Sequence, residues 1–266
     1  MLKLLVLATL LTVALRLWFL HFEGRTLYYP MRPWEATPAD AGLKFQEITL
    51  QSADGVRLSA WYIPNPRGTF TLLYLHGNAG NISHRVFAVP FFYKMGLSTF
   101  LLDYRGYGKS EGRPSEKAFY ADARTAYDHV RNVLRTDPQR IILFGESLGG
   151  AVALELANQV PVRCVICDGT FSSALDMGRI YFPFLPVRWL ITQKYDSATM
   201  AANLHVPKWF VHSRQDQIVP FKLGERLFAA ACAPKEFVER SGDHSNYLAD
   251  PVVYERLLKV ITSPAK

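Results

Sequence analysis

The chain has 266 residues, a formal net charge of +7 and a hydrophobic content of 49%. This is long enough for one large domain with a buried core, and too apolar for a disordered or low-complexity protein. The Lys and Arg residues are scattered along the sequence without a zinc-finger, RRM or helix-turn-helix signature. The composition therefore argues against nucleic acid as a partner.

The first 25 residues differ in character from the rest. Residues 4–15 are apolar apart from two threonines, and after Arg16 the apolar run continues to Leu20. Its length is near the lower limit for crossing a bilayer, about 17 residues, and aromatic residues typical of a membrane interface follow. We expect residues 1–25 to form an uncleaved single-pass signal anchor; the alternative is a hydrophobic helix packed against the domain. The flanking positive charges are nearly balanced, so the side of the membrane stays open.

Strand and helix patterns alternate through residues 26–266, which we interpret as one domain. Residues 45–51 and 56–63, joined by a turn containing Asp54-Gly55, predict an antiparallel hairpin. Further strands are predicted at 70–75, 98–102, 141–144, 164–167, 208–212 and 236–239, and helices at 83–95, 115–134, 148–159, 221–231 and 252–261. This order predicts an α/β fold with a mostly parallel sheet and helices on both faces, whose ligands gather at the carboxyl ends of the central strands.

The alternation stops between Thr170 and Val206. Residues 181–190 are rich in aromatic residues and proline, and the segment is short for an independent domain. We interpret residues 171–206 as a small lid over the strand ends. A connecting loop with a packing helix explains the pattern equally well.

The pentapeptide Gly145-Glu146-Ser147-Leu148-Gly149 indicates a nucleophilic serine. It follows an apolar strand pattern and runs directly into a helix pattern, which is the strand–turn–helix context of a nucleophile elbow. In such a turn the serine backbone is strained, and side chains on the flanking glycines would clash. We therefore predict that Ser147 is a catalytic nucleophile.

A serine hydroxyl needs a general base, and the base needs a group that orients it. Among seven histidines, His244 is the one in a loop after the last predicted strand, where the order Ser–acid–His places the base. Asp216, in the turn after the strand 208–212, is the favoured acid because its loop should neighbour that of His244. Asp168, at the end of the preceding strand, is the alternative. Asp243 is interpreted as a surface residue.

The oxyanion of the reaction needs backbone N–H donors. We expect one from Leu148 at the start of the elbow helix, and one from Asn78 in the loop His76-Gly77-Asn78-Ala79-Gly80-Asn81. The segment 103–110 follows another strand end, but its glycine spacing fits neither a P-loop nor a dinucleotide fingerprint. It is interpreted as structural, with Asp103 and Arg105 tying loops together beneath the site.

These motifs together resemble a known family. H-G-N-A-G-N at 76–81, D-Y-R-G-Y-G-K-S-E-G at 103–112 and G-E-S-L-G-G-A at 145–151, followed by the Asp216 and His244 loops, are similar to the membrane-anchored serine α/β-hydrolases, in particular the alpha/beta hydrolase domain-containing proteins. The resemblance runs from about Tyr28 to the C-terminus. It implies an eight-stranded α/β-hydrolase fold, a Ser147–Asp216–His244 triad and an N-terminal signal anchor. His212-Ser213 departs from the His-Gly that relatives usually carry before the acid.

We therefore expect a serine hydrolase that cleaves a carboxylic ester or thioester through an acyl-enzyme, with a lipid-like or acylated substrate. The alternatives are a serine peptidase of the prolyl-oligopeptidase superfamily and a non-catalytic, membrane-tethered binding protein. No metal cluster or nucleotide loop is visible in the sequence, so no cofactor is expected. The oligomeric state stays open.

Overall fold

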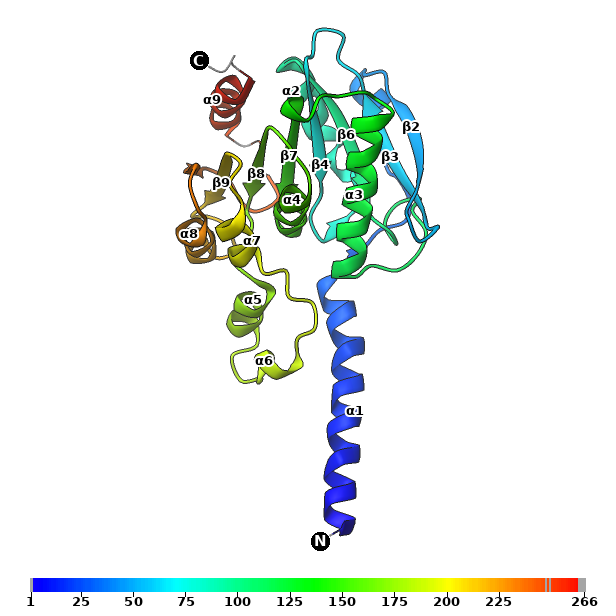
Figure 1. The fold of residues 1–266 in the computed structure, drawn as a ribbon, viewed down its shortest axis with the longest axis vertical. Coiled ribbons are helices and arrows are strands. Elements are labelled where there is room, and N and C mark those ends of the chain that lie inside the picture. Colours follow the sequence, from blue (N-terminus) through cyan, green and yellow to red (C-terminus); the bar gives the residue numbers. More distant parts are fainter. Residues whose placement is uncertain (1, 247, 249, 263–266) are drawn as a thin grey trace.

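An eight-stranded sheet forms the centre of the computed structural model, which describes residues 2–246, 248 and 250–262 (Figure 1). The strand order is β10-β9-β8-β7-β4-β6-β3-β2. The strands are β2 (Gln46–Gln51), β3 (Arg57–Ile63), β4 (Phe70–Leu75), β6 (Leu97–Asp103), β7 (Ile141–Glu146), β8 (Cys164–Asp168), β9 (Lys208–Ser213) and β10 (Lys235–Arg240). β3 pairs antiparallel with both β2 and β6, and the remaining pairs are parallel. The predicted fold class and the antiparallel edge are confirmed.

Helices pack on both faces of the sheet and define two cores. One core contains side chains of α3 (Glu116–Asn132), α4 (Leu148–Gln159), α7 (Ser197–Asn203) and α8 (Phe221–Ala230). The other contains side chains of α2 (Val89–Lys94), α9 (Pro251–Thr262) and the 3₁₀ segment η2 (Ile82–Ala88). The central strands β4, β6 and β7 are buried almost throughout, which explains why most of their residues are apolar.

The helix predicted at 83–95 is divided in two. Residues Ile82–Ala88 form η2 and α2 begins at Val89, so Pro90 lies in the first turn of α2. Proline has no N–H to continue a helix from the preceding turn, but it fits a first turn, where that donor has no partner. The prediction of one continuous helix was wrong for this reason.

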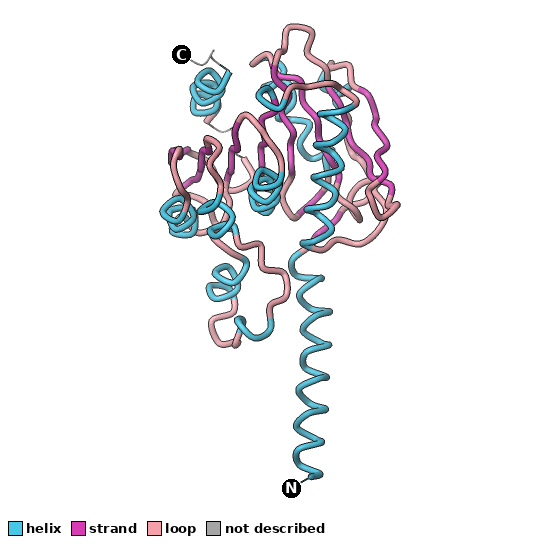
Figure 2. Tube along the Cα trace, in the orientation of Figure 1, coloured by secondary structure: helices cyan, strands magenta, loops and turns pink. Residues whose placement is uncertain are grey.

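The predicted anchor coincides with α1 (Leu2–Leu27), which leaves the sheet domain as a long helix (Figure 2). Its sequence is apolar on all sides rather than on one stripe. Within the described residues, no helix combines the length and apolar character that crossing a membrane requires. Membrane anchoring stays a prediction.

The segment 171–206 contains three helices in two different settings. α5 (Ala174–Tyr181) and α6 (Val187–Leu190) lie near α1, at the end of the molecule from which α1 projects (Figure 1). α7 instead packs against α4 and α8 and belongs to the layer that covers the sheet. Two short strands that were not predicted pair in parallel: β1 (Tyr29–Pro30), which directly follows α1, and β5 (Ala79–Gly80), which follows β4.

Candidate active site

Ser147 lies in a strained turn between β7 and α4. Its backbone has φ 53° and ψ −116°, outside the regions that non-glycine residues normally adopt. A Cβ on Gly149 would lie 2.0 Å from the carbonyl oxygen of Leu75, and one on Gly145 would lie 2.4 Å from the carbonyl oxygen of Gly149. The predicted strain at the serine and the need for flanking glycines are both confirmed.

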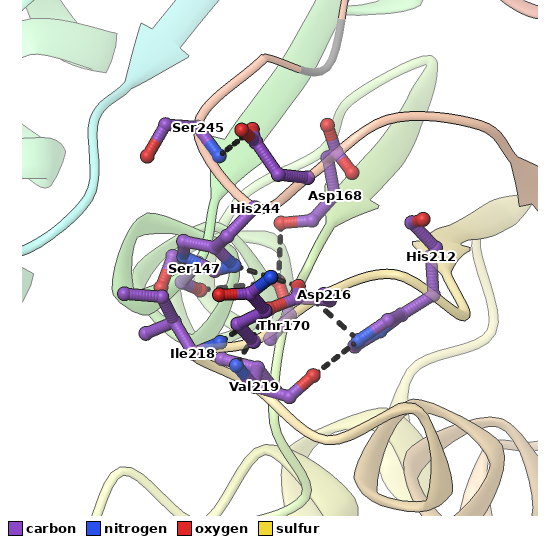
Figure 3. A network of polar contacts seen from close by, with 12 residues as sticks. Ser147, Asp168, Thr170, His212, Asp216, Ile218, Val219, His244 and Ser245 are labelled. Atoms are coloured by element: carbon purple, nitrogen blue, oxygen red, sulfur yellow. Dashed lines mark hydrogen bonds and ion pairs between the residues drawn. The ribbon is translucent and has the colours of Figure 1, made fainter.

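The structure brings His244 and Asp216 together beside this turn (Figure 3). The Nδ1 atom of His244 lies 2.7 Å from Oδ2 of Asp216, so the carboxylate accepts the Nδ1 proton. The other oxygen, Oδ1, accepts the backbone amides of Ile218 at 2.9 Å and Val219 at 2.7 Å. These bonds hold the carboxylate in one orientation, and Oδ2, which faces His244, also lies 3.5 Å from Nε2 of the buried His212.

Asp168, the alternative acid, has different partners. Its carboxylate accepts the Nε of Arg240 at 2.9 Å and the hydroxyl of Tyr254 at 2.6 Å. Its backbone carbonyl accepts the amide of Ser147 at 2.7 Å. The structure thus places Asp216, and not Asp168, against the histidine.

The turn before Asp216 accommodates the serine found where relatives usually carry glycine. The Oγ of Ser213 accepts the amide of Gln215 at 3.0 Å, and its carbonyl accepts the amide of Asp216 at 3.2 Å. His212 is buried, with Nε2 2.8 Å from the carbonyl oxygen of Val219. The departure in sequence therefore leaves the carboxylate of Asp216 directed at His244.

The acid and the base shift each other's pKa in opposite directions. Burial alone would raise the pKa of Asp216, but the hydrogen bond and charge of His244 and the two amides outweigh it, so the pKa is lowered. Burial alone would lower the pKa of His244, but the hydrogen bond and charge of Asp216 outweigh it, so this pKa is raised. Because Asp216 raises the pKa of His244, it makes the imidazole a stronger general base.

The two predicted oxyanion donors lie in the same pocket as Ser147. Asn78, Ala79 and Leu148 all line this pocket. A Cβ on Gly77 would lie 3.4 Å from the Cβ of Ser147, so the loop that carries Asn78 runs directly against the serine. Leu148 is the first residue of α4, and amides in a first helical turn have no acceptor within the helix.

A buried ion pair joins the elbow to the oxyanion loop. Arg85 donates to Glu146 through Nη2 at 2.8 Å and Nε at 3.1 Å, and Tyr74 donates to the same carboxylate at 2.7 Å. Burial would raise the pKa of Glu146, but the charge and hydrogen bonds of Arg85 outweigh it and lower the pKa to about 2. Arg85 also donates to the carbonyl of Ala79 at 2.8 Å. The residue before the nucleophile is therefore linked to the loop that faces it.

Arg240 holds the histidine loop in a similar way. From the end of β10 its Nη1 donates to the carbonyls of Asp243 at 2.9 Å and Ser241 at 3.1 Å. Its Nη2 lies 3.5 Å from the carbonyl oxygen of His244. The carboxylate of Asp243 accepts two amides of its own loop and does not contact the imidazole. Sequence reasoning identified neither this arginine nor Arg85.

The segment 103–110 is structural, as predicted. Asp103 accepts the indole N–H of Trp34 at 2.7 Å and the amide of Ile82 at 2.9 Å. Arg105 donates to Asp122 at 2.6 Å and to Asp54 at 2.7 Å. These contacts tie four separate segments together beside the sheet.

The pocket at Ser147 has a volume of about 500 Å³. Its walls come from α1, the oxyanion loop, the elbow, the lid segment and the turn after Asp216. Apolar side chains of the lid predominate, among them Ala174, Met177 and Phe182. Such a volume and lining suit a small ligand with an apolar portion.

A serine elbow between a central strand and the following helix of a mostly parallel eight-stranded sheet is typical of an α/β-hydrolase fold. Residues 71–186 match the family model for the alpha/beta hydrolase fold. The chain is 36% identical to the Alpha/beta hydrolase domain-containing protein WAV2 of Arabidopsis thaliana, over 80% of this chain and 76% of that protein. The chain therefore belongs to the alpha/beta hydrolase family.

Two further comparisons bear on the fold and on relatives. The chain is 34% identical to the Saccharomyces cerevisiae protein named Uncharacterized membrane protein YNL320W, over 75% of this chain and 74% of that protein. The structure is similar to that of the Pyrococcus furiosus esterase Pf2001, with a TM-score of 0.72, 20% identity, and coverage of 88% of this chain and 96% of the esterase. The second likeness concerns the fold alone.

Proposed function

We propose that the protein is a serine hydrolase that cleaves a carboxylic ester or thioester through an acyl-enzyme. The observation that carries this proposal is the 2.7 Å contact between His244 and Asp216 beside the strained elbow of Ser147. Ser147 lines the pocket as the nucleophile, and the paired base and acid lie beside its turn. The likeness of the fold to that of an esterase agrees with the proposal.

The reaction follows from the orientation of the imidazole. Asp216 accepts the Nδ1 proton of His244, which leaves Nε2 as the acceptor for the hydroxyl proton of Ser147. The serine oxygen attacks the acyl carbon while that proton moves to Nε2, and collapse of the tetrahedral intermediate transfers it to the leaving alcohol or thiol. Water then gives its proton to Nε2, attacks the acyl-serine and releases the acid, and the proton returns to Ser147.

The backbone amides of Asn78 and Leu148 would stabilise the tetrahedral oxyanion. Each such donor contributes about 3 kcal/mol to the transition state in comparable sites. Arg85 holds the loop that carries Asn78 through its bond to the Ala79 carbonyl. Arg240 holds the loop that carries the base, His244.

We infer a lipid-like or acylated substrate from the pocket. Its lid wall presents apolar side chains such as Met177 and Phe182 to the space beside Ser147. A hydrocarbon chain placed there would gain about 0.8 kcal/mol for each buried methylene.

We also propose that α1 and the lid hold the protein at a membrane. On α1, Leu10 and Trp18 are largely exposed, and on the lid Phe184 is 96% and Trp189 77% exposed. Exposed apolar groups in this number are typical of a surface that binds lipid or protein. A relative named as a membrane protein supports the same idea. The change Phe184→Ser with Trp189→Ser should weaken sedimentation with lipid vesicles, and unchanged sedimentation would contradict the role of the lid.

Labelling with a fluorophosphonate probe tests the serine hydrolase assignment. Wild type should be labelled and Ser147→Ala should not. Ser245→Ala is the matched control, because Ser245 is exposed in the histidine loop and is tied to Asp243 through its amide (Figure 3). Labelling of Ser147→Ala at the wild-type rate would refute the assignment.

A panel of matched esters, thioesters and amides then separates the reaction classes. We expect hydrolysis of esters or thioesters and little of amides. Amide cleavage at comparable rates would favour the peptidase alternative. Failure of every substrate and of the probe would favour a non-catalytic binding protein.

A further inference from the structure

The N-terminal helix forms part of the wall of the Ser147 pocket. Five residues from its last turns line the same space as the serine. They are Phe19, Phe22, Glu23, Thr26 and Leu27. A helix that served purely as an anchor would not need to present side chains to the site.

The helix is fastened to the lid by a buried carboxylate. Glu23 is 7% exposed and accepts the backbone amides of Thr192 at 2.8 Å and Gln193 at 3.0 Å, as well as the hydroxyl of Thr192. The ring of Phe22 meets that of Phe182 edge-on, with centroids 6.1 Å apart. α1 and the lid therefore form two joined walls rather than two separate covers.

The last residue of α1 is bonded to the oxyanion loop. The side chain of Asn78 donates to the carbonyl of Leu27 at 3.0 Å, and the amide of Tyr29 donates to the carbonyl of Asn78 at 2.9 Å. The next residue, Tyr28, contacts the lid segment, because its hydroxyl lies 2.8 Å from that of Tyr195. The position of the helix is thus set within the site itself.

We propose that α1 is the wall along which the acyl chain of the substrate binds, and that Phe22 and Thr26 set the chain length that the enzyme accepts. This inference rests on the proposed function and adds the residues that select its substrate. The acyl carbon lies at Ser147, and its chain extends between Thr26 and Phe22 on one side and Met177 on the other. A larger side chain on the helix shortens this space, and a smaller one lengthens it.

The test is the acyl chain-length profile of the full-length protein on p-nitrophenyl esters from acetate to dodecanoate. In wild type, kcat/KM should rise by about fourfold per methylene until the pocket is filled. Thr26→Trp should lower kcat/KM for the long esters by at least about tenfold relative to acetate. Phe22→Ala should move the optimum to longer chains.

Arg25→Trp is the matched control for the tryptophan substitution. Arg25 is exposed on the same turn of α1 and does not line the pocket. Its variant should keep the wild-type profile. Wild-type profiles in both Thr26→Trp and Phe22→Ala would overturn the proposal.

A binding measurement separates this inference from the proposed function. In a Ser147→Ala background, Thr26→Trp should weaken binding of dansyl-undecanoic acid by about tenfold, and Arg25→Trp should not. If wild type neither hydrolyses esters nor reacts with the probe, the proposed function fails, while this difference in binding would still support α1 as the wall. Equal binding by the two variants would refute it.

Discussion

Substituting Arg240 should lower the free energy of unfolding more than substituting the arginine of an exposed ion pair does. The side chains of Arg240 and Asp168 are 0% and 2% exposed, and their ion-pair distance is 2.9 Å. Arg240→Met leaves the Asp168 carboxylate buried, with the Tyr254 hydroxyl as a remaining donor. Breaking one partner of a buried pair costs about 3–5 kcal/mol.

The expected loss is measurable by thermal and urea unfolding. For a domain of this size, about 3–5 kcal/mol corresponds to a fall in Tm of about 6–20 °C. Arg214→Met is the matched control, because Arg214 pairs with Glu239 at a similar 2.8 Å while both side chains are largely exposed. It should cost about 0–1 kcal/mol.

The stability lost in Arg240→Met should depend on pH, and its direction follows from the pKa of Asp168. Burial already raises the pKa of Asp168 despite the arginine, and loss of Arg240 raises it further. The folded variant then binds a proton that the unfolded chain releases, so the destabilisation is largest above the folded-state pKa and shrinks as pH falls through it.

The double variant Arg240→Met with Asp168→Asn removes the buried charge and should recover most of the lost stability. Because Arg240 also holds the loop of His244, kcat/KM should stay low in both variants. A single variant that loses less than about 1 kcal/mol, or a double variant as unstable as the single, would refute the reasoning.

Three further outcomes are expected. Asp216→Asn should lower kcat by about 10⁴-fold, whereas Asp168→Asn should lower it far less; equal losses in kcat would reopen the choice of acid. Only the neutral imidazole of His244 is a base, and Asp216 raises its pKa, so the acidic limb of kcat/KM against pH should have its midpoint above about 6.5. Asp216→Asn should move this midpoint to lower pH. Gly149→Ala should cost about 1–3 kcal/mol or more in urea unfolding, because its Cβ would lie 2.0 Å from the carbonyl oxygen of Leu75; a neutral effect would show that the elbow can relax.

The parts of the site that follow from local pattern were predictable. Ser147 was found because a strand, a glycine-flanked turn and a helix adjoin in the sequence. Asp216 and His244 followed from the order of strand ends in a parallel sheet. Each of these predictions depends on the order of strands, turns and helices along the chain, which can be read from the sequence.

The contacts that support the site depend on packing between distant segments. Arg240 and Asp168 are 72 positions apart, and Arg85 and Glu146 are 61 apart, so no periodicity joins them. A local signal existed for α1: Glu23 is the one acidic residue between Leu2 and Leu27. A lone carboxylate in an apolar helix needs hydrogen-bond donors, and here the lid supplies them.

The pocket and the triad together draw on segments from α1 to the loop after β10, and this bears on the order in which the site is synthesised. Phe22 and Thr26 are made first, Ser147 midway, and His244 after the last strand. A nascent chain that lacks β10 holds a serine with no base to activate it. Under the proposed mechanism, hydrolytic activity therefore begins only after the loop that carries His244 has been made.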